Sequence, residues 1–327
     1  MTDQQYPKRQ PGKQLPPAAG PWNNPQSPYG ANELPRSRNT AEPAFVRVPA
    51  RRRSSPGCCL AYLFVSAGFG LLSLSVYLLF PARTNILILG IDYTPSYSAV
   101  GRSDTMILST FLPHKGYVGM LSIPRDLWVS IPGYGENRIN TAHFFAEAST
   151  TGSGPEKAME TVRQNFGVAV NRYVRLRFDG VREIVNAMGG VDIELDRPMA
   201  NYPAGKHHLT GNKALAFARN RQGSDDFFRM EQGQLLIKAM FKQMLNPMKW
   251  VRLPWVLAAL TQSVDTNVPV WIWPRLGFTL LRTGPDGIDH RTIRREMVTP
   301  FSTSEGAAVL APNWDQINPV LLEIFEQ

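Results

Sequence analysis

Cysteine is almost missing from this chain, because only the adjacent Cys58 and Cys59 occur among 327 residues. Any domain that follows them has no disulfide and must be stabilised by its own apolar core. Histidine is scarce as well, and His207-His208 is the only pair of the five that lies close in sequence. No metal-binding spacing results, which argues against a histidine metal site. Ser103 and Thr105 have no histidine near them in sequence to act as a base, which disfavours serine-type catalysis.

Long apolar runs are missing too, with one exception. Residues 58–80 (CCLAYLFVSAGFGLLSLSVYLLF) carry no charge and are numerous enough to span a hydrocarbon core of about 30 Å. Arg51-Arg52-Arg53 precede the run, so the positive-inside rule predicts a cytoplasmic N-terminus and an exoplasmic C-terminal domain. The run is too long for a signal peptide, and Phe80-Pro81-Ala82 is a poor cleavage site. We therefore expect a single-pass anchor in the cell membrane.

Acidic residues are rare in the first 80 residues, where 3 Asp/Glu face 9 Lys/Arg, whereas the remainder holds 23 against 26. The net charges are therefore +6 and +3, and the part expected to fold is only mildly basic. This balance argues against a nucleic-acid partner, which would need a basic folded face. Residues 1–57 also contain 11 of the 27 prolines and show no apolar periodicity, so they predict a disordered, proline-rich cytoplasmic tail.

What remains predicts an α/β domain over residues 84–247, with a mixed central β-sheet and helices on both sides. Alternating and apolar runs indicate strands, and apolar residues at helical spacing indicate helices. The expected strands are 85–91, 105–112, 117–123, 173–178 and 191–195, and the expected helices are 155–166, 181–188, 211–219 and 226–245. Residues 248–327 are rich in tryptophan and are expected to form a helical extension, with a strand near 295–299, that packs on this domain.

Arginine and aspartate gather where the early strands begin or end. Asp92 closes the first run, Arg102 and Asp104 open the second, and Arg125 follows the third. Arginine offers a planar, permanently charged set of donors to phosphate, and Mg²⁺ takes a few carboxylate oxygens while sharing phosphate oxygens. These residues therefore predict a site for phosphate and a divalent metal, although Arg–Asp pairs also form ordinary surface salt bridges.

A second basic cluster, Arg219 and Arg221, ends the helix expected at 211–219 and is followed by Gly223-Ser224. Two arginines two residues apart leave a helix on different sides, so they converge on one ligand only if the helix ends between them. Gly223 and Ser224 favour that ending. Several guanidinium groups would match the oxygens of a pyrophosphate.

Eight segments in order resemble the LytR-CpsA-Psr family of membrane-anchored phosphotransferases, over about residues 85–247. The segments are NILILGID, GRSDTMILS, LSIPRDLWVSIPG, RINTAH, YVRLRFDG, VNAMGGVDIEL, ALAFARNR and SDDFFR. The resemblance implies transfer of a glycopolymer from a polyprenyl-pyrophosphate carrier to peptidoglycan. It also implies a long apolar groove for the polyprenyl chain. The candidates to line it are Phe144, Phe145, Val162, Phe166, Leu235 and Met240, and a position in the ordinary core is an equally favoured interpretation of each.

The resemblance also implies residue roles. Asp92 and Asp104 are expected to bind Mg²⁺, and Asp226 or Asp92 to act as the base for the acceptor hydroxyl. The expected catalytic set is Asp92, Arg102, Asp104, Arg125 and Asp226, and the expected pyrophosphate contacts are Arg102, Arg125, Arg138, Arg219, Arg221 and Arg229.

Two positions depart from the family pattern. Arg138 stands where lysine is usual, which replaces a point charge by a planar donor set. Gln232-Gly233 stand where the pattern has Arg-Gln, and Gln234 lies one residue later, about 100° further around a helix. The contact expected from this helix is therefore altered. A receptor that binds a phospholipid or wall polymer without turnover and a polyprenyl-pyrophosphate pyrophosphatase stay as alternative functions.

Overall fold

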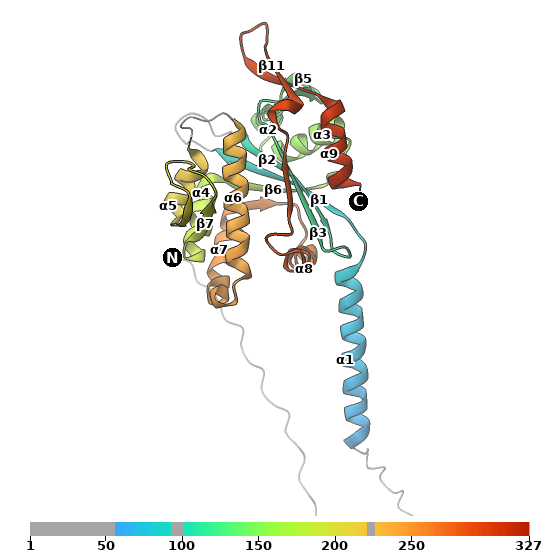
Figure 1. Ribbon diagram of the computed structural model, residues 1–327. Coiled ribbons are helices and arrows are strands. Elements are labelled where there is room, and N and C mark those ends of the chain that lie inside the picture. Colours follow the sequence, from blue (N-terminus) through green and yellow to red (C-terminus); the bar gives the residue numbers. More distant parts are fainter. Residues whose placement is uncertain (1–55, 93–100, 221–225, 327) are drawn as a thin grey trace, which may run out of the picture. The chain divides into compact units, whose positions relative to one another are not determined.

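The computed structural model (Figure 1) describes residues 56–92, 101–220 and 226–326. The predicted tail therefore lies outside the described residues, except for its last two positions. The predicted cap at Ser224 or Asp225 and the side chains of Asp92 and Asp226 lie outside them as well.

The order of elements along the chain confirms an alternation of helices and strands. The elements are α1 (Pro56–Leu79), β1 (Thr84–Asp92), β2 (Arg102–Leu112), β3 (Tyr117–Ile123), β4 (Trp128–Ile131), β5 (Gly135–Arg138), α2 (Thr141–Ser149), α3 (Gly154–Phe166), β6 (Arg172–Arg177), α4 (Phe178–Met188), β7 (Val191–Leu195), β8 (Gly205–Leu209), α5 (Gly211–Arg219), α6 (Asp226–Leu245), the 3₁₀ helix η1 (Pro247–Arg252), α7 (Leu253–Ser263), β9 (Val264–Thr266), η2 (Val270–Ile272), α8 (Trp273–Thr283), β10 (Asp289–Thr292), η3 (Arg295–Met297), β11 (Val298–Ser302), β12 (Ala308–Pro312) and α9 (Trp314–Phe325).

Helix α1 coincides with the predicted anchor. Among the described residues it is the one helix long and apolar enough to cross a membrane, with a candidate span at Leu60–Leu79. Its 24 residues correspond to about 36 Å of helix, which exceeds the hydrocarbon core of about 30 Å. Apolar side chains along it are exposed, for example Tyr62 and Phe64.

A six-stranded mixed sheet in the order β10-β3-β2-β1-β6-β9 forms the centre of the domain. β1 runs antiparallel to β2 and parallel to β6, and β10 runs parallel to β3. Both edge strands, β9 and β10, come from the sequence after residue 247. The region predicted as a helical extension with a strand, residues 248–327, thus also supplies the two outer strands of the sheet.

The two faces of the sheet bury different side chains, as the two-residue period of a strand requires. Leu87 and Leu89 on β1 lie in a core with residues of α3 and α9. Ile86, with Ile88 at its margin, lies in a second core with residues of α6 and α8. Figure 1 likewise shows helices on both sides of the sheet, as the sequence predicts.

Most predicted helices and strands occur within two or three residues of their expected bounds, because local signals mark their ends. Helix α3 starts with Pro155 in its first turn and ends at Gly167, which adopts φ of +67°, a conformation that glycine tolerates best. The predicted strand 191–195 is present as β7, but it pairs only with β8 in a separate hairpin. The strand expected near 295–299 begins at Val298, after the short helix η3.

Candidate functional site

A β-bulge determines which way Asp104 points. Thr105 pairs with Gly90 and Ser103 pairs with Ile91, so Asp104 is the extra residue of β2 at this register shift. The bulge breaks the alternation of the strand, and Asp104 and Thr105 both line one pocket, whereas Ser103 is fully buried and donates to the Asn140 carbonyl at 3.3 Å. A Cβ at Gly90 would lie 2.9 Å from the Thr105 Cβ, so the floor of the pocket requires glycine there.

Arg125 connects the pocket to a short chain of alternating charges. Its Nη1 donates to Asp104 Oδ1 at 2.9 Å, and its Nε donates to Asp126 Oδ2 at 3.4 Å. Asp126 also faces Arg138, with Nε and Oδ1 3.3 Å apart. Asp126 therefore orients Arg125. The guanidinium of Arg125 is thereby held against Asp104 at the start of β2.

The pocket, which we call the α6 pocket, has a volume of about 540 Å³. Its walls are formed by residues of β1, β2, β6, α4, α5 and α6 and by Arg125, two residues after β3. The lining residues are Ile88, Gly90, Asp104, Thr105, Arg125, Leu176, Phe178, Val181, Ala218, Arg219, Arg229, Met230, Gly233, Leu236, Ile237, Met240, Phe241 and Met244. Three arginines and one carboxylate give the lining a net charge of +2, and nearly all other lining residues are apolar.

Charged and apolar parts of this pocket are separated along α6. The α6 residues that line it recur at helical spacing from Arg229 to Met244, a path of about 22 Å at 1.5 Å per residue. Arg229 lies near the N-terminal end of that path, and Met240, Phe241 and Met244 lie near the C-terminal end. The face of α6 therefore presents a cation at one end and a continuous apolar wall beyond it.

The altered family positions on α6 fall in different places. Gly233 lines the pocket, and nothing lies within 4 Å of where its Cβ would be. Gln234 points to the sheet and donates to the Ser122 hydroxyl at 2.6 Å and to the Arg291 carbonyl at 3.1 Å. Gln232 is buried, and its Oε1 has no hydrogen-bond partner within the described part of the chain. Gln234 thus does not take the place of the glutamine that the family pattern has at position 233. The pocket is wider at Gly233 than it would be with a glutamine side chain there.

Of the expected pyrophosphate contacts, the structure brings Arg125, Arg219 and Arg229 together in the α6 pocket. Arg219 is exposed at the end of α5, with its guanidinium 5.3 Å from the Phe178 ring centre. Arg102 is exposed and lies 5.5 Å from the ring centre of Phe144, so it is not part of the lining.

Arg138 does not line the pocket either. Besides its contact with Asp126, its Nη2 donates to the Ala308 carbonyl at 2.8 Å. Asp92 is described only as the backbone partner of Arg102 at the end of β1, and Asp226 only as the first residue of α6. Arg221 lies outside the described residues.

Of the six candidate residues for an apolar groove, only Met240 lines the α6 pocket. Val162 and Phe166 belong to the core on the opposite face of the sheet. Phe144 and Phe145 contact each other, and Phe145 stacks on Tyr134 at 5.2 Å. Leu235 packs at the margin of the core formed by α4, α5 and β7. Helical periodicity identified apolar faces but not which face meets the core and which meets the pocket.

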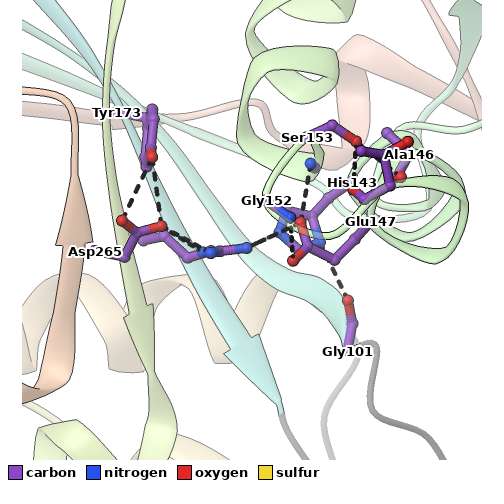
Figure 2. Close-up of polar contacts among 11 residues, drawn as sticks. Gly101, His143, Ala146, Glu147, Gly152, Ser153, Tyr173 and Asp265 are labelled. Carbon is purple, nitrogen blue, oxygen red and sulfur yellow. Dashed lines mark hydrogen bonds and ion pairs between the residues drawn. The ribbon is translucent and has the colours of Figure 1, made fainter.

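A second hollow of about 320 Å³ lies beside the start of β2, and we call it the Arg175 cleft. Its lining includes His143, Glu147, Arg175, Arg177 and Asp265. Figure 2 shows this cluster. Arg175 lies 3.1 Å from Glu147 and 2.7 Å from Asp265, so two carboxylates balance the two arginines.

His143, which is 1% exposed, holds the entry to β2. Its Nδ1 and the Gly101 carbonyl are 3.2 Å apart, and its Nε2 lies 3.3 Å from Nη1 of Arg175. A carbonyl can only accept and a guanidinium can only donate, so the ring is neutral, with its proton on Nδ1. Burial, followed by the charge of Arg175, lowers the pKa of His143 to about 4. The sequence analysis missed this residue, although RINTAH contains it.

Glu147 completes the cleft from the next turn of α2. Its carboxylate accepts from the backbone N–H groups of Gly152 and Gly154, each at 2.9 Å. Burial alone would raise the pKa of Glu147, but these hydrogen bonds and Arg175 outweigh it and lower the pKa. The cleft is therefore a connected polar network with balanced charge.

Within the described ranges, no three or more histidine, cysteine or acidic side chains are placed so that they could hold a metal ion together. Mg²⁺ commonly uses one or two carboxylates and completes its shell with phosphate oxygens and water. Asp104 presents a half-buried carboxylate in the α6 pocket, and Asp92 ends the neighbouring strand. The oxygen donor is of the type that Mg²⁺ prefers, in a pocket with space for further ligands.

Known proteins similar to this chain include bacterial teichoic acid transferases and a regulatory protein. The chain is 32% identical over 190 residues to "Polyisoprenyl-teichoic acid--peptidoglycan teichoic acid transferase TagU" of Oceanobacillus iheyensis, which covers 56% of this chain and 58% of the relative. It is 27% identical over 202 residues to TagV of Bacillus subtilis, covering 57% and 50%. "Regulatory protein MsrR" of Staphylococcus aureus is 29% identical over 195 residues, covering 57% of each. The chain thus matches only about half to three-fifths of the length of these relatives.

Solved structures show the same fold. B. subtilis TagV has a TM-score of 0.61 and 24% identity, covering 75% of this chain and 98% of that one. A structure described as "TagT bound to LIIa-WTA" has a TM-score of 0.59 and 20% identity, covering 75% and 91%. The LytR_cpsA_psr family model matches residues 81–321, which include the strands, the bulge and the whole α6 pocket. This chain belongs to the LytR-CpsA-Psr family.

Proposed function

We propose that this protein is a membrane-anchored phosphotransferase that moves a glycopolymer from a polyprenyl-pyrophosphate carrier to peptidoglycan. The observation that carries the proposal is the α6 pocket, whose cationic part continues into an apolar wall along α6. A lipid pyrophosphate has the same two parts, an anion with several oxygens and a long hydrocarbon chain. The transferase names of the TagU and TagV relatives support this assignment.

In the proposed mechanism the arginines bind and polarise the pyrophosphate. Arg125, Arg219 and Arg229 line the pocket from three different elements, so their guanidinium groups can approach one anion from different sides. Charge on the phosphoryl oxygens grows as the bond to the lipid phosphate breaks, and fixed cations stabilise that charge. Arg125 is additionally oriented by Asp104 and Asp126.

A magnesium ion fits this proposal, with Asp104 and Asp92 as its ligands. When bound, the ion would supply positive charge to the pyrophosphate oxygens. The acceptor is a sugar hydroxyl of peptidoglycan, which requires a base. Asp226 and Asp92 are the proposed candidates for that base. Asp92 ends β1 and Asp226 begins α6, and both of these elements line the α6 pocket.

The test is incubation of the full chain, in lipid nanodiscs, with a polyprenyl-pyrophosphate oligosaccharide, Mg²⁺ and peptidoglycan oligomers. We expect a covalent glycopolymer–peptidoglycan product by mass spectrometry. Released phosphate without this product would indicate a pyrophosphatase. Binding without turnover would indicate a receptor. The name of the relative "Regulatory protein MsrR" is compatible with that alternative.

Membrane topology is part of the same proposal. With Arg51–Arg53 before the span, the domain that follows α1 is proposed to be exoplasmic. Protease added to intact spheroplasts should then remove the sequence after Phe80 and leave the N-terminal tail protected. A protected C-terminal domain would contradict this orientation.

A further inference from the structure

An unusually apolar surface covers η1, α7, η2 and α8, and we call it the tryptophan face. Large apolar side chains on it are strongly exposed, whereas such residues normally lie in a core. The most exposed are Met248 at 84%, Val270 at 80%, Val251 at 76%, Trp271 at 71%, Trp255 at 62%, Leu281 at 59% and Trp250 at 55%. A concentration of this kind indicates a surface that binds something apolar.

Basic residues accompany these tryptophans. Residues 247–283 contain Lys249, Arg252, Arg275 and Arg282 but only one acidic residue, Asp265. Tryptophan mixed with lysine and arginine is typical of protein surfaces at the boundary between lipid headgroups and hydrocarbon chains. A protein partner would instead favour a surface from which lysine is depleted. The composition therefore fits a lipid surface, with the positive charge matched to anionic headgroups.

The tryptophan face is continuous with the end of the candidate membrane span. Arg275 on α8 donates to the Phe80 carbonyl at 3.0 Å, and its guanidinium lies 5.9 Å from the Tyr77 ring centre. The Tyr77 hydroxyl in turn donates to the Trp271 carbonyl on η2. These contacts join α8 and η2 to the last turn of α1, where a helix leaves the hydrocarbon core.

The same face adjoins the apolar end of the α6 pocket. The indole Nε1 of Trp250 donates to the carbonyl of Met244 at 3.1 Å, and Met244 is the last α6 residue that lines the pocket. A small cavity next to it is lined by Met244, Trp250 and Val256. Figure 1 shows α7 at the lower end of α6. The apolar part of the pocket therefore ends where the tryptophan face begins.

We propose that the tryptophan face inserts shallowly into the bilayer that α1 spans, so that the polyprenyl chain passes between the membrane and the α6 pocket without entering water. The proposal rests on α1 crossing the membrane and extends the proposed function from a pocket to a route of substrate entry. The exposed indoles would lie about 5–10 Å into the bilayer surface, as in other interfacial segments.

Fluorescence quenching tests the contact in the full chain, reconstituted into vesicles that contain brominated phospholipids. The seven tryptophans divide into Trp250, Trp255, Trp271 and Trp273 on the tryptophan face and Trp22, Trp128 and Trp314 elsewhere. A variant with W22F, W128F and W314F keeps only the first group, and we expect it to lose most of its emission when the lipid is brominated. The complementary variant with W250F, W255F, W271F and W273F should lose little.

Bromine near the headgroup end of the acyl chain should quench more strongly than bromine near its terminus. Equal emission of the first variant in brominated and ordinary lipid would overturn the proposal. Cross-linking between copies through this face, together with absent quenching, would overturn it in favour of a dimer. Carbonate extraction separates these results from failure of the α1 anchor, because a protein without a membrane span is released. Quenching is also measured without any substrate, so its result does not depend on the proposed transfer reaction.

The double variant V251K/V270K tests the route of entry. Both side chains are more than three-quarters exposed, so lysine should leave the fold intact. We expect transfer from a long-chain polyprenyl donor to fall several-fold, whereas transfer from a short-chain, water-soluble donor should keep its rate. An unchanged rate with the long-chain donor, or an equal fall with both donors, would overturn the entry route.

Discussion

The α6 pocket and the Arg175 cleft are both lined by residues near the ends of β1 and β6, but they differ in charge balance. The α6 pocket is lined by three arginines and one carboxylate. The Arg175 cleft is lined by two arginines and two carboxylates, and Arg175 itself contacts both of those carboxylates. A surplus of fixed positive charge attracts an anion, whereas a neutralised network mainly holds structure together. This difference supports our proposal that the lipid pyrophosphate binds in the α6 pocket and that the cleft has a supporting role.

Lowering the pH should destabilise the folded protein through the Arg175 cleft. His143 has a pKa of about 4 when folded and about 6.5 when unfolded, so the unfolded chain binds more protons between these values. The free energy of unfolding should therefore fall as the pH drops from 6.5 to 4, by at most about 3 kcal/mol from this group. Glu147, whose pKa is also lowered, acts in the same direction. Urea unfolding of the full chain in nanodiscs across this range measures the change.

A His143→Asn variant isolates the contribution of the imidazole, because its amide can still donate to the Gly101 carbonyl. The variant should lose less stability than the wild type over the same pH range. A profile with the same slope as that of the wild type would show that His143 does not titrate between the two states.

Removal of one cation from the α6 pocket should reduce transfer strongly. Arg219→Ala deletes a charge-assisted contact worth about 1.5–3 kcal/mol, a fall in rate of roughly 10- to 150-fold. Arg177→Ala is the matched control, because Arg177 is an exposed arginine of the Arg175 cleft. Initial rates for both variants, with folding checked by circular dichroism, measure the contrast. Equal effects of the two substitutions would remove the proposed distinction between the hollows.

The carboxylate of the α6 pocket should govern the response to magnesium. Asp104→Asn keeps the shape but removes the charge, and we expect the transfer rate to fall roughly tenfold and to depend less on Mg²⁺. Calorimetry should detect weak Mg²⁺ binding to the wild type and tighter binding once a pyrophosphate lipid is present. Asp192→Asn is the control, since Asp192 lies on the separate β7–β8 hairpin and does not line the pocket. Tight metal binding without the lipid, or full activity in a chelator, would contradict the assignment.

Substitutions at Gly233 should have the smallest effects, and they test the width of the α6 pocket. Alanine at this position should raise the free energy of unfolding by about 0.5–1 kcal/mol, because glycine is unfavourable inside a helix and nothing obstructs the added Cβ. Gly277→Ala in α8 is the control, because it is equally unobstructed but lies outside the α6 pocket. Gly233→Leu should narrow the pocket and weaken binding of a polyprenyl phosphate, whereas Gly277→Leu should not. Equal binding by both leucine variants would show that the width at residue 233 is unimportant.

The sequence predicted the parts of the molecule that local signals determine. Helices α3 and α6 follow from apolar spacing, and α3 also from its terminal residues. The gathering of Asp104 and Arg125 follows from their position at strand ends. The edge strands β9 and β10 escaped prediction because they are short and pair with residues far away in the sequence. Arg102 and Arg138 match family motifs, but tertiary contacts direct them to Phe144 and Ala308 and not to the pocket.

The bulge at Asp104 changes which face of the sheet each later residue of the motif Gly101-Arg-Ser-Asp-Thr105 points to. Because the residue count between Ser103 and Thr105 exceeds that of the opposite strand by one, deletion of a single residue there would restore strict alternation. Either the carboxylate or the threonine would then face away from the pocket, although every chemical group of the motif except the deleted one would persist. The length of this motif is thus as informative as its letters, and a relative that lacks one residue here has a different pocket floor even where its arginines align.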